Sequence, residues 1–141
     1  MQNTDLFKKI IAGEIPCEKV YEDDVAFAFL DINPVNPGHT LVIPKKWSAG
    51  FLDADEDTIC KLIPAIQNVA KAVKEATGAD AINIIQNEGE AAGQKVFHLH
   101  FHVIPRFQGD GFEHWHGKAY ASDHEARAMG EMIREKLEAR S

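Results

Sequence analysis

Between positions 98 and 104 the chain alternates histidine with apolar residues, in the order His-Leu-His-Phe-His-Val-Ile. Successive side chains of an extended strand point to opposite faces, so this order predicts a strand with His98, His100 and His102 on one face. Same-face neighbours on a strand lie about 6.6 Å apart, close enough for one phosphate group or metal ion to touch two imidazoles. Because imidazole can act as a nucleophile, acid, base or metal ligand near neutral pH, we expect the function to reside here.

Composition limits the classes of partner. The chain has 141 residues, 45% of them hydrophobic, which is typical of a single globular domain with a real core. Its 15 basic and 22 acidic residues give a net charge of −7, which argues against nucleic acid or an anionic membrane as a partner. Cys17 and Cys60 form no metal or redox motif, and no apolar run is long enough for a leader or a membrane span. These features predict a soluble, cytoplasmic protein.

Hydrophobic spacing and turn residues predict the order of the elements. An α+β domain is indicated, in which a hairpin leads into a mostly antiparallel sheet with helices on one face. Pro64 lies inside the longest predicted helix and should bend or break it. The expected elements are a helix over 5–12, strands over 18–22, 25–30 and 39–43, a helix over 55–77, strands over 81–86 and 96–105, and a helix over 122–139.

The loop over 87–95, directly before the histidine strand, suits an anion. Gly89 and Gly93 allow the backbone to approach a phosphate closely, and Asn87 and Gln94 carry amide donors. This combination favours phosphoryl chemistry, in which one imidazole attacks phosphorus while neighbouring donors hold the oxygens.

A metal site is the alternative interpretation of the same strand. Two histidines in a His-x-His pattern can ligate zinc, iron or copper, and such sites usually recruit a further histidine, cysteine or carboxylate. The distant histidines His39, His114 and His116 show no fixed ligand spacing, so the metal hypothesis has little support but stays open.

Residues 98–104 match the pattern His-φ-His-φ-His-φ-φ at every position, where φ is apolar, and the chain therefore resembles the histidine triad family. The resemblance extends over residues 10–22, 29–32, 37–45 and 87–106, which together span most of residues 5–106. It implies a single histidine triad domain over 1–141, with its core at about 5–106 and a C-terminal extension and helix at about 107–141.

The resemblance, closest to the nucleoside phosphoramidase-like branch, also implies a fold and an activity. Two chains are expected to form a homodimer with a continuous sheet. The expected reaction is hydrolysis or transfer at the α-phosphate of purine nucleoside 5′-phosphoramidates or related nucleotidyl conjugates. By this resemblance His100 forms a covalent nucleotidyl-histidine, His98 and His102 flank it, His102 donates to the phosphate or leaving group, and His39 supports the catalytic ring.

The nucleotide pocket follows from the same resemblance. Asp31 is expected to accept hydrogen bonds from the ribose hydroxyls, a role that suits a carboxylate facing two vicinal donors. Asn87, Gly93 and Gln94 are expected to line the phosphate site. Lys95 stands where many members carry a small hydroxyl residue, so it meets the phosphate as a cation or points into solvent. The expected apolar side of the pocket consists of Leu6, Phe7, Ile10, Phe29 and Ile32.

One departure from the family concerns metal. Many members carry an N-terminal Cys-x-x-Cys that joins two histidines in a structural zinc site, whereas the matching positions here are Asp5, Lys8 and, for a third ligand, Trp47. Neither structural zinc nor another cofactor is therefore expected.

Two further functions remain open at this point. One is hydrolysis of dinucleoside polyphosphates. The other is nucleotide binding or scaffolding with little turnover, in which the C-terminal helix and the aromatic stretch over 112–120 could serve a partner protein.

Overall fold

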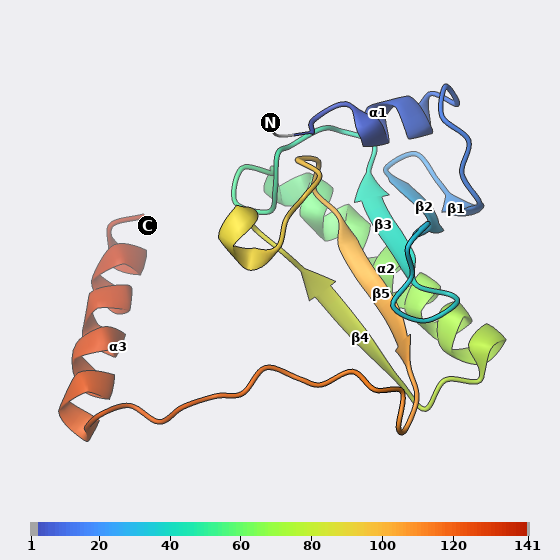
Figure 1. Ribbon diagram of the computed structural model, residues 1–141. Coiled ribbons are helices and arrows are strands. Elements are labelled where there is room, and N and C mark those ends of the chain that lie inside the picture. Colours follow the sequence, from blue (N-terminus) through green and yellow to red (C-terminus); the bar gives the residue numbers. More distant parts are fainter. Residues whose placement is uncertain (1–2, 141) are drawn as a thin grey trace. The chain divides into compact units, whose positions relative to one another are not determined.

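The computed structural model describes residues 3–140, which fall into two compact units, one ending at Asp110 and the other beginning at Gly111. Figure 1 shows the helices and strands of both units. No helix in the described part of the chain combines the length and hydropathy that crossing a bilayer requires. In chain order the elements are α1 (Leu6–Ile11), β1 (Lys19–Glu22), β2 (Ala26–Leu30), β3 (Thr40–Pro44), α2 (Glu56–Thr77), β4 (Ala81–Gln86), the 3₁₀ helix η1 (Glu90–Ala92), β5 (Phe101–Arg106) and α3 (Asp123–Glu138).

The first unit is built on one antiparallel sheet with the strand order β1-β2-β3-β5-β4. Asp23 closes the predicted hairpin between β1 and β2, because its Oδ1 accepts from the amides of Val25 and Ala26 at 2.8 and 2.7 Å. The β1–β2 register shifts between Lys19 and Tyr21, which marks an irregularity of the bulge type at this outer strand. The α+β class and the antiparallel sheet are confirmed.

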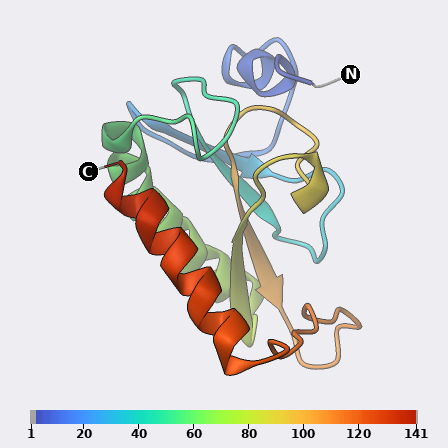
Figure 2. The ribbon, with the colours of Figure 1, turned by 90° about the vertical axis from the view of Figure 1, so that its left-hand side faces the viewer.

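Helices cover both faces of this sheet. The alternation along β2 places Ala26 and Ala28 in the core cluster under α2, whereas Phe27 and Phe29 join the opposite cluster that contains Phe7 of α1. Figure 2 shows α2 running along one face of the sheet. The prediction that the helices share one face is wrong for α1. Both faces of β2 are apolar, so both need cover from water.

The long helix α2 begins and ends as the sequence predicts. Asp55 Oδ1 accepts from the Thr58 amide at 2.9 Å at its start, and Gly78 at its end adopts the left-handed conformation with φ of 70°. Its buried stripe comprises Leu62, Ala65, Ile66, Val69 and Val73. The helix continues through Pro64 without a break. Pro64 is exposed, and the packed stripe holds the turns on both sides of it.

The histidine strand is shorter than predicted. Instead of spanning 96–105, β5 begins at Phe101, so His98 and His100 precede it in an irregular segment. The amide of Leu99 donates to the Ser48 carbonyl at 3.0 Å rather than to a neighbouring strand. The alternation of side chains in the sequence therefore does not correspond to a continuous strand.

Residues 107–110 belong to the first unit, beyond the end of the core predicted at about residue 106. Arg106 holds this extension, because its Nε and Nη2 donate to the Asp110 carboxylate at 2.8 and 3.0 Å. The second unit contains α3, which Ser122 caps by accepting from the Glu125 amide at 3.1 Å. The predicted C-terminal helix is thus present.

Candidate active site

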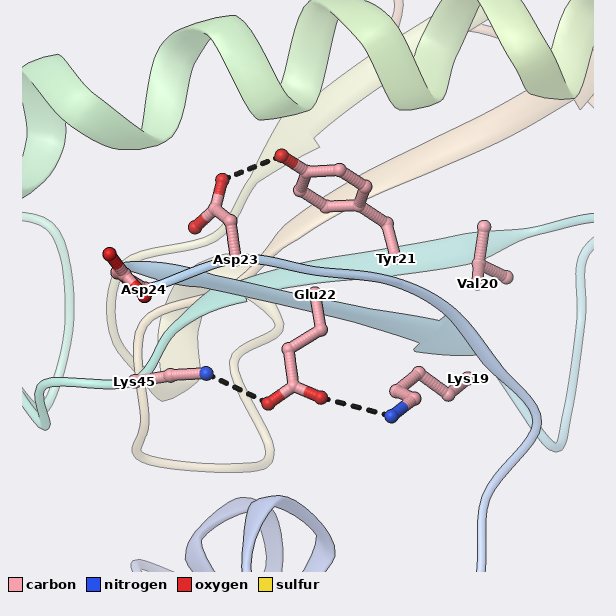
Figure 3. A pocket seen from close by; sticks show the side chains of 7 residues that line it. All are labelled: Lys19, Val20, Tyr21, Glu22, Asp23, Asp24 and Lys45. Atoms are coloured by element: carbon pink, nitrogen blue, oxygen red, sulfur yellow. Dashed lines mark hydrogen bonds and ion pairs between the residues drawn. The ribbon is translucent and has the colours of Figure 1, made fainter.

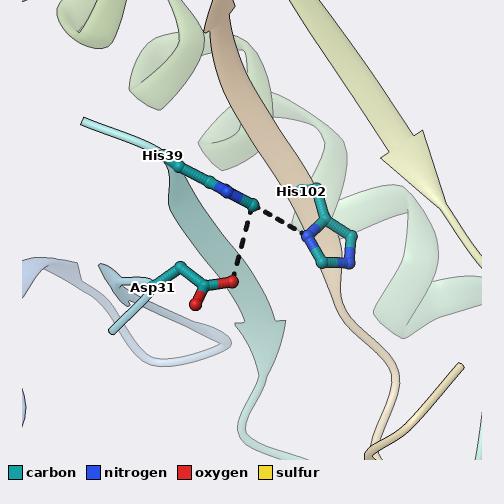
Figure 4. A group of neighbouring side chains, drawn as sticks. All are labelled: Asp31, His39 and His102. Carbon is teal, nitrogen blue, oxygen red and sulfur yellow. Dashed lines mark hydrogen bonds and ion pairs between the residues drawn. The ribbon is translucent and has the colours of Figure 1, made fainter. Parts of the chain in front are cut away.

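Three histidines gather near the ends of neighbouring strands of the sheet. His39 lies just before β3, His102 lies in β5 opposite Leu41 of β3, and His100 lies directly before β5. The ring centroids of His100 and His102 are 5.1 Å apart, as are those of His39 and His102. Asp31 follows β2 and reaches the same place, as Figure 4 shows for Asp31, His39 and His102. The sheet thus unites residues that are distant in the sequence.

His100 presents a free lone pair at Nε2. Its Nδ1 lies 2.7 Å from the carbonyl oxygen of His98, and a carbonyl only accepts, so Nδ1 carries the hydrogen. Burial lowers the pKa of His100, although the His98 carbonyl opposes this shift. The ring is therefore neutral at pH 7, and Nε2 is the unprotonated nitrogen, as a nucleophile requires.

A chain of hydrogen bonds fixes the opposite role for His102. The Val35 amide donates to His39 Nδ1 at 3.1 Å, so neutral His39 carries its hydrogen at Nε2. That nitrogen lies 2.9 Å from His102 Nδ1 and donates to it, which leaves the His102 hydrogen at Nε2. Burial lowers the pKa of His39, and burial followed by repulsion from His100 and His39 lowers that of His102 to about 4. The cluster thus holds one bare nitrogen and one N–H donor side by side.

Three residues of this region also form a candidate set of metal ligands. Asp31, His39 and His102 offer ligand atoms that lie within 4.8 Å of one another. Ligation through His39 Nε2 requires that nitrogen to lose its hydrogen, yet the Val35 amide already donates to Nδ1, so the hydrogen cannot move there. The hydrogen-bond pattern consequently favours a chain of imidazoles over metal ligation.

His98 is set apart from the other rings. Its side chain is fully buried, its Nε2 donates to the Pro44 carbonyl at 2.8 Å, and its Nδ1 has no hydrogen-bond partner within the described residues. Burial lowers the pKa of this ring too. The prediction that all three imidazoles lie on one face of a strand is therefore wrong for His98, which precedes β5 and is fully buried. Its ring joins β3 to the segment that carries His100, and its carbonyl accepts from His100 Nδ1.

The loop over 87–95 uses one of its two candidate amides internally. Gln94 is 4% exposed, its Nε2 donates to the carbonyls of Ala49 and Val96 at 2.7 and 3.0 Å, and its Oε1 accepts from the Gly89 amide at 2.8 Å. Its side chain thus has no hydrogen left for a phosphate, which corrects the predicted donor role. Gln94 instead fixes the shape of the loop.

Asn87 remains beside the turn of that loop. A Cβ placed on Gly93, whose φ is +98°, would lie 3.7 Å from Asn87 Nδ2, so the amide group and the glycine are neighbours. Lys95 is exposed. The 3₁₀ helix η1 inside this loop was not predicted, because its three residues are too few for a periodic signal.

The expected nucleoside pocket is only partly gathered. Phe7 meets His100 edge-on with centroids 5.1 Å apart, and Asp31 has a side chain 21% exposed whose Oδ2 lies 3.6 Å from His39 Nε2. Ile32, in contrast, is 89% exposed on the loop after β2. The remaining predicted residues lie within or against the core cluster beside α1, namely Leu6, Ile10 and Phe29.

A hollow of about 570 Å³ along β1 offers a second place for a ligand (Figure 3). Its polar groups are largely engaged with one another, because Lys19 and Lys45 both pair with Glu22 at 2.9 and 2.8 Å, and the Tyr21 hydroxyl donates to Asp23 at 2.7 Å. None of its lining residues belongs to the imidazole cluster, which therefore remains the candidate site.

Sequence reasoning missed the backbone partners of this site. The Val35 amide and the carbonyls of Pro44 and His98 set which nitrogen of each ring is protonated, and every residue carries a backbone carbonyl and, except for proline, an amide N–H. It also missed the contact of Trp47 with Phe97, whose carbonyl accepts from the indole Nε1 at 2.9 Å. No residue pattern in the sequence distinguishes these partners.

Comparison with known proteins agrees with this geometry. Residues 12–109 match the HIT domain family, and the chain belongs to this histidine triad family, in its Hint-like branch. It is 37% identical over 136 residues to "Adenosine 5'-monophosphoramidase hnt1" of Schizosaccharomyces pombe, covering 94% of this chain and 97% of that protein. It is also 41% identical over 110 residues to "Adenylylsulfatase HINT3" of Arabidopsis thaliana, covering 78% of this chain and 56% of that protein.

A solved structure shows the same fold. The crystal structure of SMU.412c from Streptococcus mutans UA159 superposes with a TM-score of 0.90 at 41% identity, covering 97% of this chain and 87% of the other. The chain is thus similar over most of its length to histidine triad proteins, some of which are named as hydrolases of nucleotide conjugates.

Proposed function

We propose that the protein hydrolyses purine nucleoside 5′-phosphoramidates or related nucleotidyl conjugates at the α-phosphate, through a nucleotidyl-His100 intermediate. The observation that carries this proposal is the pair of opposite tautomers: His100 offers a bare Nε2, and His102 offers an N–H beside it. A phosphoryl transfer that goes through a covalent intermediate needs both a nucleophile and a donor to the leaving group.

In the first step the His100 Nε2 lone pair bonds to phosphorus, and the bond from phosphorus to the leaving nitrogen breaks. The substrate reacts with its leaving nitrogen already protonated, so that nitrogen departs as a neutral amine, while neutral His102 donates a hydrogen bond from Nε2 and keeps its proton. His100 becomes positively charged as it forms the new bond. Water then attacks phosphorus, the bond from phosphorus to His100 Nε2 breaks, and one proton of the water passes to solvent, which releases the nucleoside monophosphate and neutral His100.

Neighbouring groups suit the remaining parts of such a substrate. Asp31 stands 3.6 Å from His39 with an oxygen that can accept from ribose hydroxyls, and the Asn87 amide adjoins Gly93 at the expected phosphate position. The phosphoramidase and adenylylsulfatase named among the relatives support a nucleotidyl substrate. Lys95 is exposed at the end of the loop.

Rapid quenching tests the proposal. The protein is mixed with adenosine 5′-phosphoramidate, quenched early and digested, and mass spectrometry should then find an added adenylyl group on the peptide that contains His100. The His100→Ala protein is the control and should show no adduct. Nucleotide binding without adduct or turnover would instead assign the site to ligand sensing. Faster turnover of diadenosine tetraphosphate would identify a dinucleoside polyphosphate hydrolase.

We further propose that two chains pair through β4, which lies at one end of the sheet, with no further strand among residues 3–140 paired to its outer edge. Beside it, α2 and β4 line an apolar hollow of about 460 Å³, in which Ile84 is 52% exposed and Ile63 is 49% exposed. An unpaired edge next to exposed apolar side chains favours association with a second strand, and two β4 edges would form a continuous sheet.

Sedimentation velocity tests this pairing. The parent protein should sediment as a dimer and Ile84→Arg as a monomer, since the charge would lie in the interface. Leu52→Arg is the matched control, because Leu52 is 81% exposed but lies outside this hollow. A monomeric parent protein would refute the proposal.

A further inference from the structure

The segment that carries His98 and His100 is held by hydrogen bonds to residues distant in the sequence and not by a regular strand pairing. The Phe97 amide donates to the Asn3 carbonyl at 2.6 Å, and the Leu99 amide donates to the Ser48 carbonyl at 3.0 Å. The Phe97 carbonyl accepts from Trp47 Nε1 at 2.9 Å. Each of these partners lies in the chain at least 50 residues away, so the position of the catalytic segment depends on distant tethers.

Residues 44–48 make three hydrogen bonds to this segment, two of those above and one from Pro44. The Pro44 carbonyl accepts from the His98 ring, the Ser48 carbonyl accepts from the Leu99 amide, and the Trp47 indole donates to the Phe97 carbonyl. Trp47 is the one member of this set that acts through its side chain. Its contribution can therefore be removed by substitution without breaking the main chain.

Trp47 also contacts helix α1. The ammonium group of Lys8 lies 4.7 Å from the Trp47 ring centroid, in the range of a cation–π interaction. The preceding residue, Phe7, packs edge-on against His100 and His98 at centroid distances of 5.1 and 5.8 Å. The indole thus joins the helix that covers the His100 ring to the backbone that precedes it.

We propose that Trp47 is a positioning residue for the nucleophile. Its N–H holds the Phe97 carbonyl and thereby orients the following peptides, including the His98 carbonyl that keeps the hydrogen of His100 on Nδ1. Phe97 is 8% exposed, so water cannot readily replace the lost donor. The catalytic part of this inference rests on the proposed function, whereas the orientation of His100 does not.

An isosteric replacement isolates the indole N–H. In a Trp115→Phe background, tryptophan at position 47 is replaced biosynthetically by 3-benzothienylalanine, which keeps the ring shape but carries sulfur in place of N–H. Trp115 is the second tryptophan of the sequence and is 83% exposed. We expect kcat on adenosine 5′-phosphoramidate to fall about tenfold with KM changed less than about twofold, as expected for one lost hydrogen bond that aligns the nucleophile.

Histidine ¹⁵N spectra provide a readout that does not depend on turnover. The tryptophan form should show His100 protonated at Nδ1, and the benzothienyl form should show a mixture of tautomers. Lys8→Met is the control, because it removes the cation but keeps the N–H, and it should change kcat by no more than about twofold. Unchanged kcat and an unchanged His100 spectrum in the benzothienyl form would overturn the proposal.

The two proposals fail in different ways. Absence of turnover and of adduct in the tryptophan form would reject the proposed reaction, while the His100 spectra would still decide the role of Trp47. Normal turnover in the tryptophan form, together with an unchanged kcat and His100 spectrum in the benzothienyl form, would reject the positioning role of Trp47 and leave the proposed reaction standing. Urea unfolding of both forms detects any global loss of structure.

Discussion

Acidification should lower the free energy of unfolding, because the unfolded chain binds protons that the buried imidazoles do not. The His102→Gln substitution should remove the part of this decrease that His102 causes. Burial holds the pKa of folded His102 at about 4, whereas the unfolded chain titrates near the ordinary value of 6.5. Between these two values the unfolded state binds a proton that the folded state does not. Stability from neutral His102 is therefore complete above about pH 6.5 and is lost as the pH falls toward 4.

The magnitude follows from that interval. One proton bound only by the unfolded state changes the free energy of unfolding by about 1.4 kcal/mol per pH unit, so His102 accounts for about 3 kcal/mol across the whole range. The pKa values of His39, His98 and His100 are also lowered by burial, so the parent protein should lose stability more steeply than one histidine explains. Glutamine at position 102 retains an oxygen that can accept from His39 Nε2.

Urea unfolding, followed by far-ultraviolet circular dichroism at several pH values between about 4.5 and 7.5, measures this slope. Between about pH 4.5 and 6 the His102→Gln protein should show a slope shallower than that of the parent by up to about 1.4 kcal/mol per pH unit, and above about pH 6.5 the two slopes should converge. His116→Gln is the matched control, since the His116 side chain is 88% exposed and should leave the parental slope unchanged. Identical slopes for the parent and His102→Gln would refute the claim that His102 is buried as a neutral ring.

Three further predictions concern the site and the fold. His100→Ala should lower kcat at least ~10³-fold, equivalent to about 4 kcal/mol, while calorimetry still detects nucleoside monophosphate binding; near-normal turnover would rule out its role. Asp31→Asn should weaken the binding of adenosine monophosphate about tenfold but leave the binding of a 2′,3′-dideoxy analogue unaffected. Equal losses of affinity for both ligands would contradict a contact with the ribose hydroxyls. Gly38→Ala should lower the free energy of unfolding in urea by about 1–3 kcal/mol, because φ is +102° and the new Cβ would lie 2.6 Å from Thr77 Cγ2. Gly109→Ala is the control, because Gly109 also has a positive φ, of +74°, but its new Cβ would meet no atom within 4 Å. An equal loss of unfolding free energy in both variants would show that the clash with Thr77 contributes nothing.

Much of the fold was predictable because its signals are local. The stripe along α2, its Asp55 and Gly78 caps and the hairpin closed by Asp23 depend on residues that are near one another in the chain. The position of α1 was not predictable in this way. Its apolar residues fit either face of a sheet, and only the assembled sheet shows that Phe27 and Phe29 need cover on the second face.

The site was predictable in its residue types but not in its detailed geometry. The alternating histidines predicted which segment carries the imidazole cluster, yet nothing local in their sequence reveals that the Leu99 amide pairs with Ser48 and not with a strand. Similarly, Asn87 and Gln94 carry the same amide group, and only the loop structure shows that the Gln94 amide is already saturated. Long-range hydrogen bonds decide such cases, and they leave no periodic trace in a sequence.

The two outer strands of the sheet differ in how readily another strand could pair with them, and this difference would limit the number of chains that can assemble. β1 has an irregular register and carries Lys19 and Glu22 as a charged pair, features that discourage another strand from adding to it. β4 instead carries the exposed Ile84 beside an apolar hollow. Pairing two β4 strands about a two-fold axis would bury the association-prone side of each chain. Only the two irregular, charged β1 strands would then remain at the outer ends of the joined sheet. Growth would then stop at a closed pair and not proceed to an open filament.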